Sequence, residues 1–275
     1  MSWVLPGDQE TRLRIAKGYP FEAPPSSYLF EDGQVRLFSE LQGEELAHWN
    51  TVVRQRTAVI AHGSNRAPEQ LARKFAGHLS AGEAIPVTAI WLKDHEVVYS
   101  AHVTRYGSVA AELIHCPGTA VQVFVTWLDQ AQLLRMHESE LPSENYTYGH
   151  LDCDWISADL RTDHDAEQGS VCRDISLPSV KLMVYRSTAG ALSFRGEAVA
   201  ISALPARGRS LQAWQQCEVL QHVHQVHGLR QCDLPELLDQ AILEAIDSSD
   251  YRRRLVRSLK KQSLDVPHPS YTIYL

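Results

Sequence analysis

The middle of the chain contains short apolar runs separated by polar or turn-forming residues, which is the pattern of β-strands. One such run covers residues 57–61 and stops at Gly63, Ser64 and Asn65. A helix is expected to follow, because Pro68 suits the first turn of a helix. We therefore predict a strand, a loop and a helix in succession. Such a unit directs backbone N–H groups at whatever lies above the loop.

The next hundred residues continue the strand pattern and include one helical segment. A helix is predicted from Asp129 to His137, because Asp129 is a good N-cap. The strand-like runs are 85–92, 96–103, 109–114, 119–128, 146–151 and 180–185, with breaks at 93–94, 106–107 and 116–118. The polar stretch 159–170 is expected to be an exposed loop.

Both ends of the chain differ from this middle part. Residues 27–30 and 35–38 flank Asp32 and Gly33, a hairpin signal, and 41–49 suits a short helix. The last third has helical periodicity, and its apolar tail is expected to dock on the body. Strands followed by helices indicate an α+β class. The expected organisation is an N-terminal extension (1–53), a core domain (54–205) and a helical segment packed on the core (206–275), with helices at 210–227, 234–246 and 250–259 and the tail at 271–275.

Composition narrows the classes of function. The 275 residues carry a net charge of −7, which argues against binding to nucleic acid or anionic membranes. A basic run at 252–261 is interpreted as the solvated face and last turns of a helix. The five cysteines are odd in number and form no CxxC, so neither a disulfide framework nor a zinc ribbon is expected. Without an evident signal peptide or a long apolar run, the expected location is the cytoplasm. The cysteines are interpreted as packing residues, with Cys116 at a turn.

Two short motifs could carry chemistry, although each is weak alone. Gly63, Ser64 and Asn65, here called the Gly-Ser-Asn loop, combine a flexible backbone with two short polar side chains. In the second motif Glu140 is expected just past the helix, where its carboxylate can point inward, and Tyr146 follows. The apolar positions of that helix, Leu133 and Met136, are spaced to pack on one face.

Taken in order, these motifs and the strands between them resemble the γ-glutamylcyclotransferase family. The resemblance covers roughly residues 55–155 and extends toward 205. In that family a strand ends in a Gly-Ser-Asn loop, and a Leu-rich helix ends in a Glu. The corresponding segments here are 61–65, 107–111, 117–127 and 133–140. Two positions differ: His62 replaces the usual Tyr before the loop, and His137 replaces the usual Asp three residues before the Glu.

The resemblance implies a fold, a reaction and a set of residues. The fold would be a compact mixed β-barrel with flanking helices. The reaction would be intramolecular aminolysis of a γ-glutamyl amide, releasing 5-oxoproline and an amine, with no metal or cofactor and a small γ-glutamyl molecule as the partner. Glu140 would be the catalytic base that takes a proton from the α-amine and passes it to the leaving nitrogen. Burial is expected to raise the pKa of this carboxyl. The substrate would be held by His62, Gly63, Ser64, Asn65 and Tyr146.

Three other interpretations stay open at this point. Ser64 could be the nucleophile of an amidase, although the second Gly of a nucleophile elbow is missing. His222, His224 and His227 could chelate a metal, although a packed helix is the simpler interpretation. The domain could also be a binding or scaffold module without turnover. A buried Glu140 that faces the loop favours catalysis, and a solvated one favours binding. The identity of the leaving amine and the oligomeric state are not specified by the residues.

Overall fold

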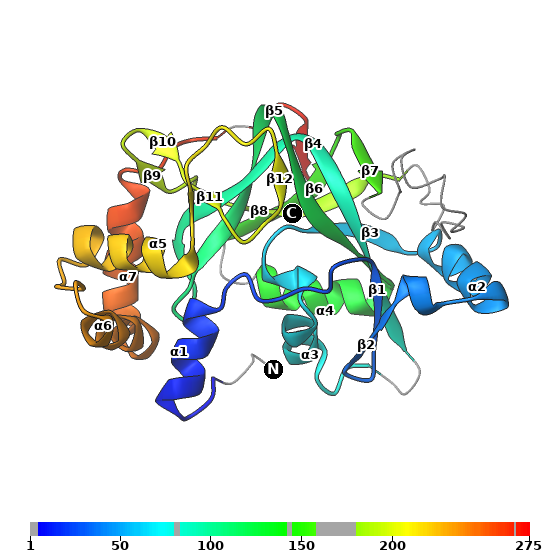
Figure 1. The fold of residues 1–275 in the computed structure, drawn as a ribbon, viewed down its shortest axis with the longest axis horizontal. Coiled ribbons are helices and arrows are strands. Elements are labelled where there is room, and N and C mark those ends of the chain that lie inside the picture. The colour runs from blue at the N-terminus through cyan, green and yellow to red at the C-terminus, as the bar shows by residue number, and fades with distance from the viewer. Residues whose placement is uncertain (1–4, 80–82, 142–144, 158–179, 267) are drawn as a thin grey trace, which may run out of the picture.

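The computed structural model describes residues 5–79, 83–141, 145–157, 180–266 and 268–275. These residues form an α+β structure with one large mixed sheet and several helices (Figure 1). The sheet contains β1 (Tyr28–Glu31), β2 (Gln34–Leu37), β3 (Thr57–Ala61), β4 (Ala84–Val103), β5 (Val109–Leu128), β6 (Tyr146–Leu151), β7 (Trp155–Ser157), β8 (Leu182–Ser187), β11 (Ala200–Ile201), β12 (Ala206–Arg207), β13 (Ala213–Trp214) and β14 (Tyr271–Ile273). A separate small hairpin joins β9 (Ser193–Phe194) to β10 (Glu197–Ala198).

The main path of the sheet runs β13-β11-β4-β5-β3-β8-β6-β14, with β1, β2, β7 and β12 paired beside it. Most neighbours are antiparallel, but β3 pairs with β8 in parallel. In the described part of the chain this path is open at both ends. The α+β class is therefore confirmed, whereas the closed barrel stays a prediction.

Helices lie at both ends of the sheet and beneath it (Figure 1). At one end, α1 contacts α6 and α6 contacts α7, and α7 also packs on β4. Beneath the sheet α3 contacts α4. No helix in the described ranges has the length and apolar character that a membrane span requires. The helices are α1 (Gln9–Lys17), α2 (Gly43–Val53), α3 (Pro68–Phe75), α4 (Gln130–Glu140), α5 (Gln216–His222), α6 (Pro235–Asp247) and α7 (Ser249–Lys260), with 3-10 turns η1 (Phe38–Glu40) and η2 (Ser64–Arg66) and a π-helical turn η4 (Val223–His227).

The break predicted at 106–107 is confirmed as the turn between β4 and β5, but the breaks predicted at 93–94 and 116–118 are wrong. The strands β4 and β5 are each continuous over 20 residues, and the two pair along most of their length. The break expected at 93–94 is a shift in register, with Asp94 at a φ of 57° and its carboxylate accepting a hydrogen bond of 2.8 Å from the backbone N–H of Gly118. Residues 116–119 of β5 thus lie opposite Asp94 alone, and this irregularity in the pairing absorbs residues that resemble a turn. Cys116, expected at a turn, consequently lies within β5.

Several other predicted elements are confirmed. The hairpin around Asp32 and Gly33, the strand–loop–helix unit at β3 and α3, and the strand β6 form where the pattern places them. The tail docks as β14 on β6. The exposed loop predicted for 159–170 lies outside the described residues.

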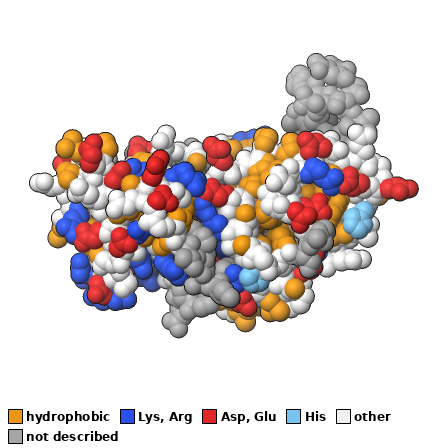
Figure 2. All heavy atoms as spheres, turned by 90° about the horizontal axis from the view of Figure 1, so that it is seen from below, with side chains coloured by type: hydrophobic (Ala, Val, Ile, Leu, Met, Phe, Trp, Pro, Cys, Tyr) orange, Lys and Arg blue, Asp and Glu red, His pale blue; other side chains and the backbone are white. Residues whose placement is uncertain are grey.

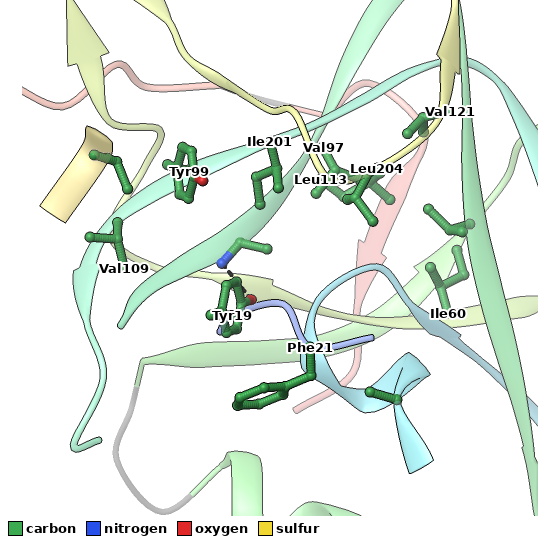
Figure 3. Packing of buried hydrophobic residues seen from close by; sticks show 14 of the residues in the cluster. Tyr19, Phe21, Ile60, Val97, Tyr99, Val109, Leu113, Val121, Ile201 and Leu204 are labelled. Atoms are coloured by element: carbon green, nitrogen blue, oxygen red, sulfur yellow. Dashed lines mark hydrogen bonds between the residues drawn. The ribbon is translucent and has the colours of Figure 1, made fainter. Parts of the chain in front are cut away.

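The N-terminal segment takes part in the core. The strand β1 pairs with β4, and Tyr19 and Phe21 are buried among residues of β4 and β5 (Figure 3). The hydroxyl of Tyr19 accepts a hydrogen bond of 2.8 Å from the backbone N–H of Ala111. This segment therefore forms part of the wall around the loop that follows β3.

Candidate functional site

A cavity of about 510 Å³ lies between the end of β3, the end of α4, the start of β6 and the turn that joins β4 to β5. The site residues predicted from the sequence all line it: His62, Gly63, Ser64, Asn65, Glu140 and Tyr146. Residues from distant parts of the chain are thus brought to one place.

The Gly-Ser-Asn loop is held in position by the N-terminal segment. A side chain at Gly63 would place its Cβ 2.5 Å from the hydroxyl of Tyr19, so any larger residue requires Tyr19 or the loop to shift. Beyond the loop, the Tyr28 hydroxyl donates a hydrogen bond of 2.8 Å to the backbone carbonyl of Arg66. The buried guanidinium of Arg66 donates in turn to the carbonyl of Phe21 at 3.1 Å. The loop therefore has a backbone that several tertiary contacts fix.

Glu140 is the last residue of α4 and not, as expected, a residue beyond it. The helix continues because the N–H of Leu141 still bonds to the carbonyl of His137, at 2.9 Å. At its other end α4 is fixed by the predicted N-cap Asp129, whose carboxylate accepts from the N–H of Gln132 at 2.9 Å. The helix thereby presents Glu140 to the Gly-Ser-Asn loop.

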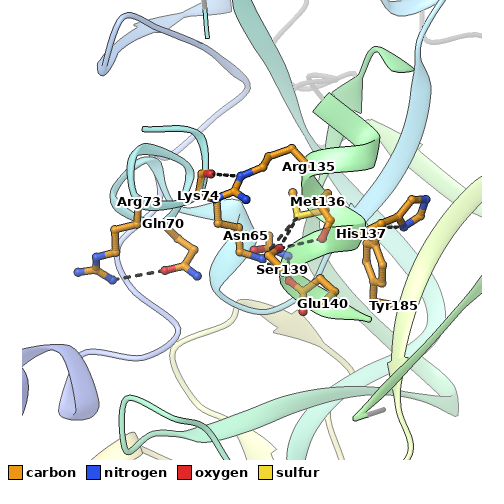
Figure 4. Close-up of polar contacts among 10 residues, drawn as sticks. All are labelled: Asn65, Gln70, Arg73, Lys74, Arg135, Met136, His137, Ser139, Glu140 and Tyr185. Carbon is orange, nitrogen blue, oxygen red and sulfur yellow. Dashed lines mark hydrogen bonds and ion pairs between the residues drawn. The ribbon is translucent and has the colours of Figure 1, made fainter. Parts of the chain in front are cut away.

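Among the described residues, the carboxylate of Glu140 has two polar partners (Figure 4). Its Oε1 atom accepts a hydrogen bond of 3.0 Å from Nδ2 of Asn65 and forms an ion pair with Nζ of Lys74. Only 13% of the Glu140 side chain and 10% of the Lys74 side chain are exposed. A buried acid therefore faces the loop, and an ammonium group lies against it.

This ion pair corrects the expected ionisation of Glu140. Burial raises the pKa of the carboxyl, but the charge of Lys74 and the hydrogen bonds from Asn65 and Lys74 lower it by more. The pKa of Glu140 is therefore below its ordinary value, so the predicted net rise is wrong even though burial by itself acts in that direction. At neutral pH the group is an ionised carboxylate that suits an ammonium ligand.

The two histidines that depart from the family pattern have different surroundings. Burial, assisted by the charge of Arg186, lowers the pKa of His62 to about 4, so its ring is neutral at pH 7. Its Nδ1 atom is buried and has no hydrogen-bond partner in the described residues, as is also true of Oδ1 of Asn65. His137 does not line the cavity, because its Nδ1 atom lies 2.7 Å from the hydroxyl of Tyr185 and its ring packs edge-on against Tyr148.

Tyrosine side chains form much of the cavity wall. Burial raises the pKa of Tyr19 and Tyr146 well above the ordinary value, and raises that of Tyr106 to about 12. Their hydroxyls thus stay protonated at physiological pH and can act as hydrogen-bond donors.

Sequence reasoning missed Lys74 and Tyr19. Lys74 gave no local signal, because a lysine in the last turn of a helix is ordinary and only the packing of α3 against α4 buries it beside Glu140. Lys74 is also fixed through its backbone carbonyl, which accepts from Nε of Arg135 at 2.9 Å. No local pattern indicated that Tyr19, 44 residues before Gly63, would reach the loop.

The serine-nucleophile and metal-site interpretations find little support in the geometry. The Ser64 hydroxyl forms a hydrogen bond with Tyr106, and Nδ1 of His62, two residues before it, has no partner among the described residues. His224 is buried with its Nδ1 atom 3.0 Å from the hydroxyl of Tyr251. The described residues contain no group of three His, Cys, Asp or Glu side chains placed to hold a metal ion.

The chain was also compared with known proteins. No family model, no curated protein and no solved structure matches the chain.

Proposed function

We propose that this chain is a γ-glutamylcyclotransferase-like enzyme, which converts a γ-glutamyl amide into 5-oxoproline and a free amine. The observation that carries the proposal is the hydrogen bond of 3.0 Å between Asn65 and Glu140, which joins two motifs 75 residues apart inside one cavity. The order of the sequence motifs supports the same reaction. The proposal includes the expectation that the strands around the cavity correspond to the barrel of that family.

The charges of the site suit the α-ammonium group of a γ-glutamyl substrate. Lys74 demonstrates that a primary ammonium fits against the carboxylate of Glu140. The contacts with Lys74 and Asn65 both use Oε1. In the described residues this leaves Oε2 as the acceptor for a second ammonium. The unpartnered Nδ1 of His62 and Oδ1 of Asn65 provide further polar positions for the same ligand.

The reaction needs one group that accepts and returns a proton, and hydrogen-bond donors that stabilise the oxyanion of the tetrahedral intermediate. Glu140 takes a proton from the α-ammonium, and the amine nitrogen attacks the γ-carbonyl carbon to form the ring bond. The oxyanion lies at the Gly-Ser-Asn loop, where backbone N–H groups begin a helical turn and have no partner within it. Glu140 then returns the proton to the leaving nitrogen as its bond to carbon breaks. The ring nitrogen loses its second proton to solvent.

The experiment is release of 5-oxoproline from a panel of γ-glutamyl amides by wild type, Glu140→Gln and Glu138→Gln. Glu138 is the matched control, because it borders the same cavity but its side chain is 64% exposed and pairs with Arg135. Loss of the general base is expected to lower kcat by roughly 10²–10⁴-fold in Glu140→Gln only. Equal product from wild type and Glu140→Gln would show that Glu140 is not the base.

One observation favours a second candidate function, a binding module without turnover. The charge of Lys74 compensates the charge of the Glu140 carboxylate and lowers its pKa. A carboxylate with a lowered pKa is a weaker base. This function predicts that a γ-glutamyl amide binds to the folded wild type in calorimetry while no amide of the panel releases 5-oxoproline.

A further inference from the structure

A second cavity, of about 570 Å³, adjoins the one that holds Glu140. The two cavities share the lining residues His102, Val103, Asn145 and Arg252. A molecule bound at Glu140 can therefore extend into the second cavity without leaving the protein surface.

The outer wall of the second cavity is the basic face of α7. Arg253, Arg257, Lys260 and Lys261 line it together with Val256, at spacings that place them on one side of the helix. In Figure 2 Lys and Arg side chains gather on the left of the view, the side on which α7 lies in Figure 1. These exposed residues agree with the solvated helix face predicted from the sequence, but they also border a hollow.

Few acidic side chains compensate the positive charges of this wall. Arg253 pairs with Asp250, whereas Arg257, Lys260 and Lys261 have no ion pair within the described ranges. Arg252 is held in place because its guanidinium donates to the carbonyls of Ala245 and Ile246, at 2.6 and 3.2 Å. Burial lowers the pKa of Arg252, and the neighbouring charges of Arg105 and Arg253 lower it further. On a chain with a net charge of −7, this is a concentrated positive field.

The imidazole of His102 lies where the two cavities meet. The Nδ1 atom of His102 is buried and has no hydrogen-bond partner in the part of the chain that the structure describes. Burial, together with the charges of Lys260 and Arg252, lowers the pKa of His102 to about 4. The ring is therefore neutral at pH 7 and can donate or accept a hydrogen bond to a ligand that passes between the cavities.

We propose that the second cavity binds the amine portion of the substrate, and that this portion carries two or more negative charges as a phosphate monoester or a dicarboxylate. The inference rests on the proposed function for the γ-glutamyl half. A single carboxylate would leave most of Arg257, Lys260 and Lys261 without a counter-charge. A nucleic acid or a membrane is less suited, because the basic residues line a hollow beside Glu140 and the chain as a whole is acidic.

The test compares γ-glutamyl amides that differ only in the charge of the amine. The neutral member is γ-glutamyl-ethanolamine, and the two charged members are its O-phosphate and γ-glutamyl-glutamate, which separate phosphate from carboxylate recognition. We expect kcat/KM of the wild type to favour at least one charged amide by about tenfold or more. The double variant Arg257→Gln with Lys260→Gln should lose this preference.

The matched control is Lys181→Gln with Arg254→Gln, which removes the same charge from exposed positions outside both cavities. This control should keep the preference. Equal kcat/KM for all three amides in wild type, or equal loss of the preference in both double variants, would overturn the inference while leaving the cyclotransferase proposal standing.

A binding measurement separates the two proposals. If no amide is turned over, calorimetry with O-phosphoethanolamine, glutamate, ethanolamine and the polyanion heparin at constant ionic strength tests the anion site directly. Binding of a charged probe that is lost only in the Arg257→Gln, Lys260→Gln variant supports the site and rejects the proposed reaction. Binding of none of these probes, or binding of heparin alone, rejects the site as a small-anion pocket.

Discussion

Replacing Lys74 with methionine tests whether its ion pair with Glu140 determines the charge of the site. Methionine keeps an unbranched side chain that is one heavy atom shorter, and it removes the ammonium. Both side chains are nearly buried, with 10% and 13% exposed, so solvent screens the pair little. Removing one partner of a buried pair costs about 3–5 kcal/mol when the other charge persists. That value is an upper bound here, because Glu140 can take up a proton instead.

The variant should reverse the way in which Glu140 makes stability depend on pH. In wild type the pKa of Glu140 lies below its ordinary value, so its contribution is present above the ordinary pKa and lost as the pH falls through the folded pKa. In Lys74→Met burial is the dominant influence and raises the pKa of Glu140. Its contribution is then present at low pH and lost as the pH rises. Relative to wild type, the variant should therefore have its lowest free energy of unfolding at high pH.

The assay is urea unfolding at pH 5 and pH 8 of wild type, Lys74→Met, Glu140→Gln and the double variant. The loss of unfolding free energy in Lys74→Met should be larger at pH 8 than at pH 5 by about 1.4 kcal/mol or more. That difference corresponds to a tenfold change in the affinity of Glu140 for a proton. The double variant should recover much of the loss at pH 8. Equal losses at both pH values, without recovery in the double variant, would refute the reasoning.

A surface pair provides the control for this experiment. Lys17 pairs with Asp239, and about 30% of each side chain is exposed, 29% and 30% respectively. Lys17→Met should therefore cost about 0–1 kcal/mol, with little difference between the two pH values.

Three further predictions concern the supports of the site. Gly63→Ala should cost about 1–3 kcal/mol in thermal unfolding, because its Cβ would lie 2.5 Å from the Tyr19 hydroxyl, and a cost that is unchanged in a Tyr19→Phe background would contradict this. Asp129→Ala should cost about 1 kcal/mol in urea unfolding by removing the N-cap of α4, whereas Asp129→Asn should retain most of the stability. Burial raises the pKa of Glu112, which pairs with Arg186, from 4.5 to about 7, so its contribution is full below pH 4.5 and lost as the pH rises through 7. Glu112→Gln should reduce the dependence of the urea unfolding midpoint on pH between 4.5 and 7. An unchanged dependence would argue against this role of Glu112.

Local signals were sufficient for the elements that present the loop and Glu140. The apolar run of β3, Pro68 in the first turn of α3 and the N-cap Asp129 each act within a few residues, so their effect can be read without knowing the fold. The hairpin at Asp32 and Gly33 is similar, because both residues adopt the positive φ that its tight turn requires.

The remaining features depend on contacts between distant segments. Asp94 and Gly118 each resemble a turn locally, yet their mutual hydrogen bond lets both strands continue. Lys74 resembles an ordinary cation in the last turn of a helix, and only the packing of α4 across α3 buries it. Because that packing was not predictable from the sequence pattern, the sign of the pKa shift at Glu140 was not predictable either.

The pairing of the strands also has a consequence for the order of folding. The strands β4 and β5 meet across the short connection between Val103 and Val109, so this hairpin needs little loop closure and can form early. By contrast, the parallel contact of β3 with β8 joins Val59 to Met183. Closing that long separation is slow, and the Gly-Ser-Asn loop that follows β3 is expected to reach its final position only late in folding.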